Sequence, residues 1–306
     1  MSEAGNNYYY RAYSFSLKSS FPIPELLPSL HVNTADVVIK IETIHKLTDN
    51  LHKNDRSDQF NQLRLLLNID QVAHYLIEDG NRITIEPYEG VTDIEIRLYL
   101  LGSAFGALMH QRGLLPVHGS AIIYKQKAIL FCGESGIGKS TLAAGFIKKG
   151  LQILADDVCV VTLDQYNNPI VHPGYPQMKL WTDSLRKLGY QLNPAITARS
   201  RQKKYSLPLQ VEFSHEPVTL TGIYVITKGI AVECKIIELF GTNKISTLNK
   251  HIYRPDYMDE MPMNRNPIQV MNMIADHCYV KLVERSAQGF LLEKLIQLID
   301  HDIDTI

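Results

Sequence analysis

The chain has 306 residues, of which 45% are hydrophobic and 21% are charged. This composition is typical of a globular protein and excludes an intrinsically disordered chain. Lysine and arginine, 31 residues together, balance the 32 aspartates and glutamates, so the net charge is −1. A globally basic field of the kind that attracts nucleic acid or anionic membranes is therefore excluded, and we expect neither as a partner.

Three further features of the sequence predict a cytoplasmic protein. Residues 1–5 lack the basic and apolar regions of a signal peptide. The longest apolar stretch, residues 98–109, is interrupted by glycines and a serine, and its length of about 12 residues is too short to span a bilayer. The four cysteines form no C-x-x-C pair and three of them lie in apolar runs, which favours reduced, packed thiols.

The first part of the chain has the pattern of short strands separated by turns. Residues 36–41 and 72–77 are strand-like, and Glu78–Asn81 forms a turn before a third strand at 82–87, which is the signature of a hairpin. The polar segment 46–61 is expected to form a surface loop. We predict a small β-rich N-terminal domain over residues 1–110 that ends in a helix.

The helix that closes this domain is predicted from Asp93 onward. Apolar residues recur at close to the 3.6-residue period, and Gly113 supplies a left-handed stop. Strands at 121–124 and 128–132 follow, then a glycine-rich turn, a helix at 140–149, and strands at 152–154 and 158–163. The turn residues of 164–169 indicate that the chain doubles back antiparallel. Residues 111–306 are therefore predicted to be an α/β domain with a mixed sheet.

A phosphate-binding motif, G-x-x-x-x-G-K-[ST], joins the strand 128–132 to the helix 140–149. In such a loop the glycines let successive backbone N–H groups point at phosphate oxygens, and the helix dipole adds positive charge. We expect Lys139 to reach the β- and γ-phosphates of ATP and the Ser140 hydroxyl to ligate Mg²⁺. The predicted nucleotide-binding residues are Gly133, Glu134, Ser135, Gly136, Ile137, Gly138, Lys139, Ser140 and Thr141.

Asp156 and Asp157 are candidate catalytic groups, because they follow the strand 152–154 at the sheet edge where α/β proteins bind ligands. One carboxylate can hold Mg²⁺ while the other accepts the proton of an attacking hydroxyl. The alternative is a turn or helix cap built from aspartate side chains. His118, which precedes the strand 121–124, is by itself only a weak signal.

These motifs carry a family resemblance. His-Gly-Ser-Ala at 118–121, the loop at 133–140 and Ala-Asp-Asp at 155–157 resemble the catalytic domain of the HPr kinase/phosphorylase family, within the phosphoenolpyruvate-carboxykinase-like P-loop proteins. The stretches 111–118 (Gln-Arg-Gly-Leu-Leu-Pro-Val-His) and 179–181 (Lys-Leu-Trp) are similar to HPr-kinase-like proteins encoded with lasso-peptide machinery. Those proteins phosphorylate a serine of the precursor peptide. The resemblance covers roughly residues 97–213.

The resemblance implies a kinase that uses ATP and Mg²⁺ and acts on the serine hydroxyl of a peptide or protein. Asp156 would be the base for that hydroxyl, Asp157 would help to hold the metal with Ser140, and His118 would lie near the γ-phosphate. The residue types alone do not fix which aspartate has which role. A homo-oligomer is expected because HPr kinases are typically hexameric.

The chain also departs from the family. HPr kinase/phosphorylase proper has an Arg-Gly-x-Gly signature and a glutamate after the aspartates, whereas residues 174–181 here read Gly-Tyr-Pro-Gln-Met-Lys-Leu-Trp. HPr as the acceptor and reverse phosphorolysis are therefore open to question. The alternatives are HPr kinase/phosphorylase itself, a free-serine kinase of the same fold, and a regulatory protein that binds ATP without catalysis.

A basic cluster precedes the strand-like residues 205–209. Lys204, the preferred member, and Arg199 are candidates for contacting the transferring phosphoryl group or an acidic peptide terminus, with a solvated loop as the alternative. The turn-rich segment 253–267 is a candidate lid or peptide-binding loop.

Overall fold

The computed structural model describes residues 7–31, 33–44, 64–190, 204–230, 232–259, 266–286 and 291–305. They form two compact units, Met1–Leu114 with Arg254–Asn264, and Leu115–Tyr253 with Arg265–Ile306. The boundary between the units lies four residues beyond the predicted one at 110. The segment 254–264 belongs to the first unit, although sequence order alone assigns it to the second domain.

The first unit is built on a sheet with the strand order β3-β1-β2-β4-β7-β6-β5. Strands β4 and β5 alternate buried and more exposed positions, whereas the hairpin strands β6 and β7 each contain three consecutive buried residues. The turn before β7 lies at Asp79–Gly80, where both residues have positive φ. The strands are β1 (Tyr8–Ala12), β2 (Phe15–Ser19), β3 (Leu27–Pro28), β4 (Val37–Ile41), β5 (Arg64–Ile69), β6 (Ala73–Glu78) and β7 (Arg82–Pro87). The predicted loop 46–61 lies outside the described residues.

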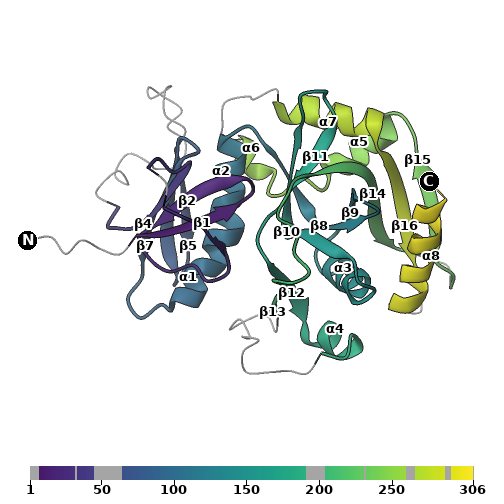
Figure 1. The fold of residues 1–306 in the computed structure, drawn as a ribbon, viewed down its shortest axis with the longest axis horizontal. Coiled ribbons are helices and arrows are strands. Elements are labelled where there is room, and N and C mark those ends of the chain that lie inside the picture. Colours follow the sequence, from purple (N-terminus) through teal and green to yellow (C-terminus); the bar gives the residue numbers. More distant parts are fainter. Residues whose placement is uncertain are drawn as a thin grey trace, which may run out of the picture. The chain divides into compact units, whose positions relative to one another are not determined.

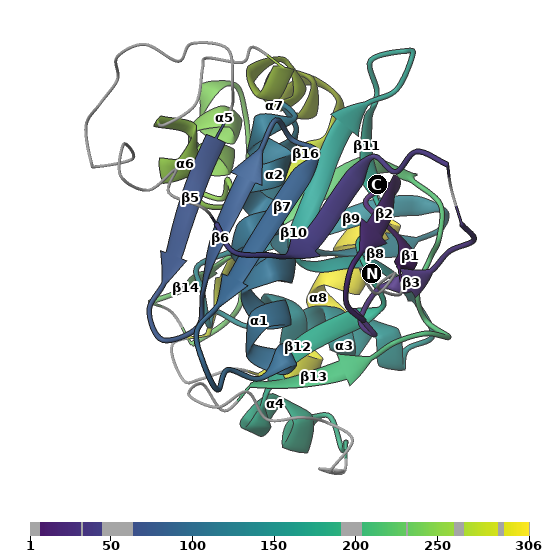
Figure 2. The ribbon, with the colours of Figure 1, turned by 90° about the vertical axis from the view of Figure 1, so that its left-hand side faces the viewer.

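A single run of helix covers one face of this sheet (Figure 2). It comprises α1 (Asp93–Tyr99), a π-helical segment (Leu100–Ala104) and α2 (Phe105–Gln111). Thr92 and Glu95 close a capping box at its start. The chain leaves the helix at Gly113, whose φ of +67° suits glycine. The short helix α6 (Asp256–Asp259) also belongs to this unit.

The second unit contains a mixed sheet with the strand order β11-β10-β8-β9-β14-β16-β15. Strands β9, β14 and β16 run parallel, and the others pair antiparallel, so the predicted mixed α/β architecture is confirmed. The strands are β8 (Leu115–Tyr124), β9 (Lys127–Gly133), β10 (Gln152–Leu163), β11 (Pro169–His172), β14 (Val218–Lys228), β15 (Lys235–Leu239) and β16 (Tyr279–Arg285). A separate antiparallel ribbon joins β12 (Gln177–Trp181) to β13 (Lys204–Pro208).

Helices lie on both faces of the mixed sheet (Figure 1). Helix α3 (Lys139–Lys148) packs on β8, β9 and β10 together with α8 (Leu292–Asp304), while α5 (Thr242–Asn249) and α7 (Asn266–His277) lie on the opposite face. The short helix α4 (Thr182–Lys187) follows β12. Each face of the sheet is therefore buried, which explains the unbroken apolar run of β9.

Strand β10 differs from the prediction. The two short strands expected at 152–154 and 158–163 are one strand, because β10 pairs with β8 from Ile153↔Ile122 to Val161↔Leu115. The aspartates lie within this strand and not at its end. Backbone irregularity occurs there nonetheless, since Asp157 has a φ of +75° and the pairing register shifts between Ile153 and Ala155.

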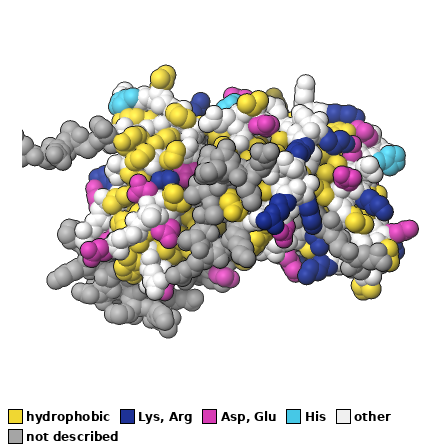
Figure 3. Space-filling model, turned by 90° about the horizontal axis from the view of Figure 1, so that it is seen from below, with side chains coloured by type: hydrophobic (Ala, Val, Ile, Leu, Met, Phe, Trp, Pro, Cys, Tyr) yellow, Lys and Arg dark blue, Asp and Glu magenta, His cyan; other side chains and the backbone are white. Residues whose placement is uncertain are grey.

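The described surface of the second unit carries charges of both signs. Figure 3 shows basic and acidic side chains interspersed on one of its faces. Among the helices in the described part of the chain, none combines the length and apolar character needed to cross a membrane.

Candidate functional site

The phosphate-binding motif forms a tight loop between β9 and α3, in the strand–loop–helix setting that the sequence predicts. Gly133, Gly136 and Gly138 have φ values of +141°, +79° and +112°, which side-chain-bearing residues rarely adopt. A Cβ on Gly133 would lie 2.5 Å from the Ile226 carbonyl oxygen. The glycines are therefore required by the loop's conformation, and not only by its contact with phosphate.

Lys139 lies folded into its own loop and is only 6% exposed. Its Nζ donates to the carbonyl oxygens of Gly133 at 2.9 Å and Glu134 at 3.0 Å, and lies 3.0 Å from His118 Nε2. Because an ammonium group can only donate, His118 Nε2 is the acceptor of this hydrogen bond. An ammonium held this way is within reach of any phosphate that enters the loop.

His118 links the phosphate loop to the aspartates. With Nε2 accepting from Lys139, the ring proton lies on Nδ1, which donates to the Asp157 carbonyl oxygen at 3.0 Å. The same Nδ1 lies 3.5 Å from Asp157 Oδ1. Burial and the neighbouring Lys139 charge lower the pKa of His118, although Asp157 opposes this shift. The neutral Nδ1–H form is therefore favoured.

Asp156 is the more buried aspartate, with 6% exposure, and both its oxygens are engaged. It lies opposite Ser120 in the β8–β10 ladder; the Ser120 hydroxyl donates to Oδ1 at 2.6 Å, and the Lys179 N–H donates to Oδ2 at 2.9 Å. Ser140 of the phosphate loop lies near this carboxylate and has a small lowering effect on its pKa. Burial raises the pKa of Asp156, and the hydrogen bonds from Ser120 and Lys179 partly offset that rise.

Asp157 points to a different set of groups. Its Oδ2 accepts from Lys179 Nζ at 2.9 Å, and its side chain is 25% exposed, whereas that of Lys179 is 11% exposed. Lys179 thus contacts both aspartates, one through its backbone and one through its ammonium group. The sequence indicated Lys179 only as part of the resemblance at 179–181. In β12 it alternates with buried Met178 and Leu180, which places it on the face opposite to these core residues, so strand periodicity alone did not predict its contact with the aspartates.

Two residues from a distant part of the chain complete the surroundings of His118. Its backbone N–H donates to the His251 carbonyl oxygen at 2.8 Å, and the Tyr253 ring centroid lies 5.8 Å from that of His118. Burial, together with the charge of Lys139, lowers the pKa of His251 to about 4. His251 could not be predicted as a neighbour of His118, because it follows β8 by more than a hundred residues and contacts this strand only in the folded chain.

The oxygen donors of the site fit Mg²⁺. Ser140 and Asp156 supply one hydroxyl and one carboxylate that lie near each other, and P-loop proteins hold the metal with this pair of residue types. Mg²⁺ usually takes only one or two carboxylates, with phosphate and water as its other ligands. The described residues contain no group of three or more His, Cys, Asp or Glu side chains arranged for a metal ion.

The remaining predicted contacts lie at the edge of what the structure describes. Lys204 begins β13, where its backbone pairs with Trp181. Its side chain and Arg199 are outside the described part of the chain, as are residues 260–265 of the predicted lid. Thr141, at the start of α3, has its hydroxyl 2.7 Å from that of Ser184 in α4.

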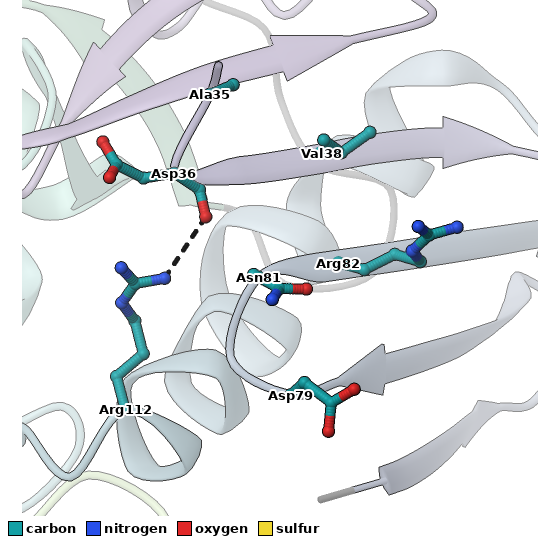
Figure 4. A pocket seen from close by; sticks show the side chains of 7 residues that line it. All are labelled: Ala35, Asp36, Val38, Asp79, Asn81, Arg82 and Arg112. Atoms are coloured by element: carbon teal, nitrogen blue, oxygen red, sulfur yellow. Dashed lines mark hydrogen bonds between the residues drawn. The ribbon is translucent and has the colours of Figure 1, made fainter. Parts of the chain in front are cut away.

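A separate pocket of about 410 Å³ lies in the first unit (Figure 4). Asp36, Asp79, Arg82 and Arg112 contribute its charged lining, and Arg112 donates to the Asp36 carbonyl oxygen at 3.3 Å. None of the predicted site residues lines it. Its charged groups come from the turn before β7, the start of β4 and the end of α2.

Comparison with known proteins finds likenesses among solved structures. No protein-family profile matches the chain, and no curated protein matches its sequence. Among solved structures it is similar to the HPr(Ser) kinase/phosphatase from Coxiella burnetii, with 14% sequence identity and a TM-score of 0.34. The match covers 62% of this chain and 92% of that one.

Proposed function

We propose that this protein is an ATP- and Mg²⁺-dependent kinase that transfers the γ-phosphoryl group to a serine hydroxyl of a peptide. The observation that carries this proposal is the continuous contact from the phosphate loop to the aspartates: Lys139 Nζ to His118 Nε2 at 3.0 Å, and His118 Nδ1 to Asp157. A triphosphate gripped by the loop would thus present its terminal phosphorus to a carboxylate.

The chemistry requires a positioned acceptor, a proton acceptor and neutralisation of charge. A bond forms between the serine oxygen and the γ-phosphorus, while the bond from that phosphorus to the β–γ bridging oxygen breaks and its electron pair leaves with ADP. The serine proton passes to a carboxylate. Lys139 leaves the carbonyl oxygens of the loop and binds the phosphate oxygens instead. Its positive charge then stabilises the negative charge on them. Mg²⁺, held by Ser140 and Asp156, supplies further positive charge when bound.

We assign the proton acceptor to Asp157 and the metal contact to Asp156, the reverse of the assignment that the resemblance implies. Two observations support this division. Asp156 is nearly buried, its oxygens are engaged by Ser120 and the Lys179 N–H, and the metal-binding candidate Ser140 lies near it. Asp157 is one-quarter exposed on its side chain, so an acceptor hydroxyl can approach it.

The peptide acceptor is proposed from the sequence. The stretches at 111–118 and 179–181 are similar to kinases encoded with lasso-peptide machinery, so a lasso-peptide precursor is the preferred substrate. We expect the enzyme to act in the cytoplasm and to form a homo-oligomer. The chain keeps the phosphate loop and the aspartates that a kinase needs, but it lacks the Arg-Gly-x-Gly signature of HPr kinase/phosphorylase. This combination favours a peptide acceptor over HPr.

The test is incubation of the full chain with ATP, Mg²⁺ and each acceptor in turn: a lasso precursor, HPr and free serine. Mass spectrometry should show a gain of about 80 Da per phosphoryl group on the peptide alone. Phosphorylation of HPr or free serine would replace the peptide assignment. Nucleotide binding without transfer to any acceptor would contradict the kinase proposal and indicate a regulatory nucleotide-binding protein.

Two variants separate the aspartates. Asp157→Asn should retain Mg²⁺–ATP binding and lose about 10²- to 10⁴-fold in transfer rate, the usual effect of removing a general base. Asp156→Asn should instead raise the Mg²⁺ concentration needed for half-maximal nucleotide binding. The opposite pattern would restore the assignment of Asp156 as the base.

A further inference from the structure

Arg285 is the last residue of β16, the strand that lies two positions from β9 in the parallel part of the sheet. Strand β9, which leads into the loop, pairs with β14, and β14 pairs with β16. Arg285 is half-buried, and its Nη1 donates to the carbonyl oxygen of Ile137, in the middle of the loop. Neither the motif nor the family resemblance includes this residue.

The backbone of Arg285 is held firmly. Its carbonyl oxygen accepts from the Gly229 N–H at 2.9 Å, and a Cβ on Gly229 would lie 2.4 Å from that oxygen. Glycine at 229 therefore allows the chain after β14 to approach the end of β16. The guanidinium group extends to the loop from an anchored strand end.

A phosphate loop binds anions only when its carbonyl oxygens point outward, so that its N–H groups point inward. In this structure two cations hold the loop carbonyls: Lys139 binds those of Gly133 and Glu134, and Arg285 binds that of Ile137. Phosphate entering the loop competes for Lys139. The contact from Arg285 is made on a different carbonyl, and it can persist when Lys139 turns to the phosphates.

We propose that Arg285 is a positioning residue that preorganises the phosphate loop for nucleotide binding. It acts through the Ile137 carbonyl and not by touching the reacting atoms. This inference rests on the proposed nucleotide site, but it requires only nucleotide binding and not phosphoryl transfer. The expected consequence is an effect on nucleotide affinity that exceeds any effect on kcat.

The test measures the dissociation constants of ATP and ADP for the full chain and its variants in the presence of Mg²⁺. Arg285→Met should weaken binding of both nucleotides by about tenfold or more, because hydrogen bonds to charged groups are among the stronger ones. Arg285→Lys, which keeps the charge and a donor, should fall between Arg285→Met and the parent. At saturating ATP, kcat should remain within about threefold of the parent value.

Lys228→Met is the matched control. Lys228 is exposed and is the register partner of Arg285 at the end of β14, so this variant removes the same charge from the same edge of the sheet. Its nucleotide affinity should equal that of the parent. Equal weakening by Lys228→Met would show that general charge explains the effect, and would overturn the proposal.

Parental affinity in Arg285→Met would also overturn it. Should Arg285→Met fail to fold, Arg285→Gln serves in its place, and the same tenfold criterion applies. If the parent protein binds ATP but phosphorylates no acceptor, the kinase proposal is contradicted. The Arg285 test can still be interpreted, because it measures nucleotide affinity alone.

Discussion

Ser120 and Asp156 face each other across the antiparallel strands β8 and β10, and the Ser120 hydroxyl donates a 2.6 Å hydrogen bond to Asp156 Oδ1. Ser120 is fully buried and Asp156 nearly so. A buried carboxylate is strongly favoured in its ionised form only when donors compensate for lost water. This serine therefore helps to keep Asp156 charged and oriented beside Ser140.

The first prediction concerns this hydrogen bond. Ser120→Ala should lower kcat by about tenfold or more, since a hydrogen bond to a charged group contributes about 1.5–3 kcal/mol. Losing a donor to the ionised form raises the pKa of Asp156 further, so activity should fall most at low pH. Rate profiles against pH check this, with Ser103→Ala, a buried serine of the first unit, as the control. Superimposable profiles for Ser120→Ala and the parent would exclude the role.

The second prediction concerns Lys179, whose ammonium lies 2.9 Å from Asp157 Oδ2. Lys179→Met should lower kcat by about tenfold or more without weakening nucleotide binding, because Asp157 loses the partner that orients it. Lys179→Arg should recover part of the activity. Transfer kinetics and nucleotide titration measure the two effects, and Lys235→Met, an exposed lysine on β15, is the control. A loss confined to nucleotide affinity would contradict this role.

The third prediction tests the packing of β14 against β16. Gly222 pairs with Tyr279, and a Cβ on Gly222 would lie 1.9 Å from the Tyr279 ring. Gly222→Ala should lower the free energy of unfolding by about 1–3 kcal/mol, the usual cost of overpacking. Chemical denaturation of a double-mutant cycle with Tyr279→Leu checks the cause, because the alanine should cost less once the ring is gone. An equal cost in both backgrounds would refute the clash.

The fourth prediction is a pH dependence of stability. Burial lowers the pKa of His251 from 6.5 to about 4, so between these values the unfolded chain binds more protons than the folded one. The free energy of unfolding should therefore rise with pH through this window, and its His251 contribution should be complete above about pH 6.5. His251→Gln should flatten the slope. Denaturation at several pH values measures it, and the exposed His215→Gln should leave the slope unchanged.

Much of the site could be predicted because its parts are local. The G-x-x-x-x-G-K-[ST] spacing dictates a glycine-rich turn, and the observed loop has positive φ at Gly133, Gly136 and Gly138. The helix predicted at 140–149 was also close to the observed α3. Local spacing and backbone sterics suffice for such features.

Local sequence patterns sufficed to predict the phosphate loop, the mixed α/β character of the second unit and Asp156, Asp157 and His118 as candidate site residues. They left the roles of the two aspartates open, because two adjacent residues of the same type cannot be told apart by residue type. The folded chain gives them different surroundings: Asp156 contacts Ser120, whereas Asp157 contacts His118 and Lys179. The contacts of Lys179, His251 and Arg285 likewise join segments that are far apart in the sequence. They could not be predicted from local patterns, because these segments meet only when the chain has folded.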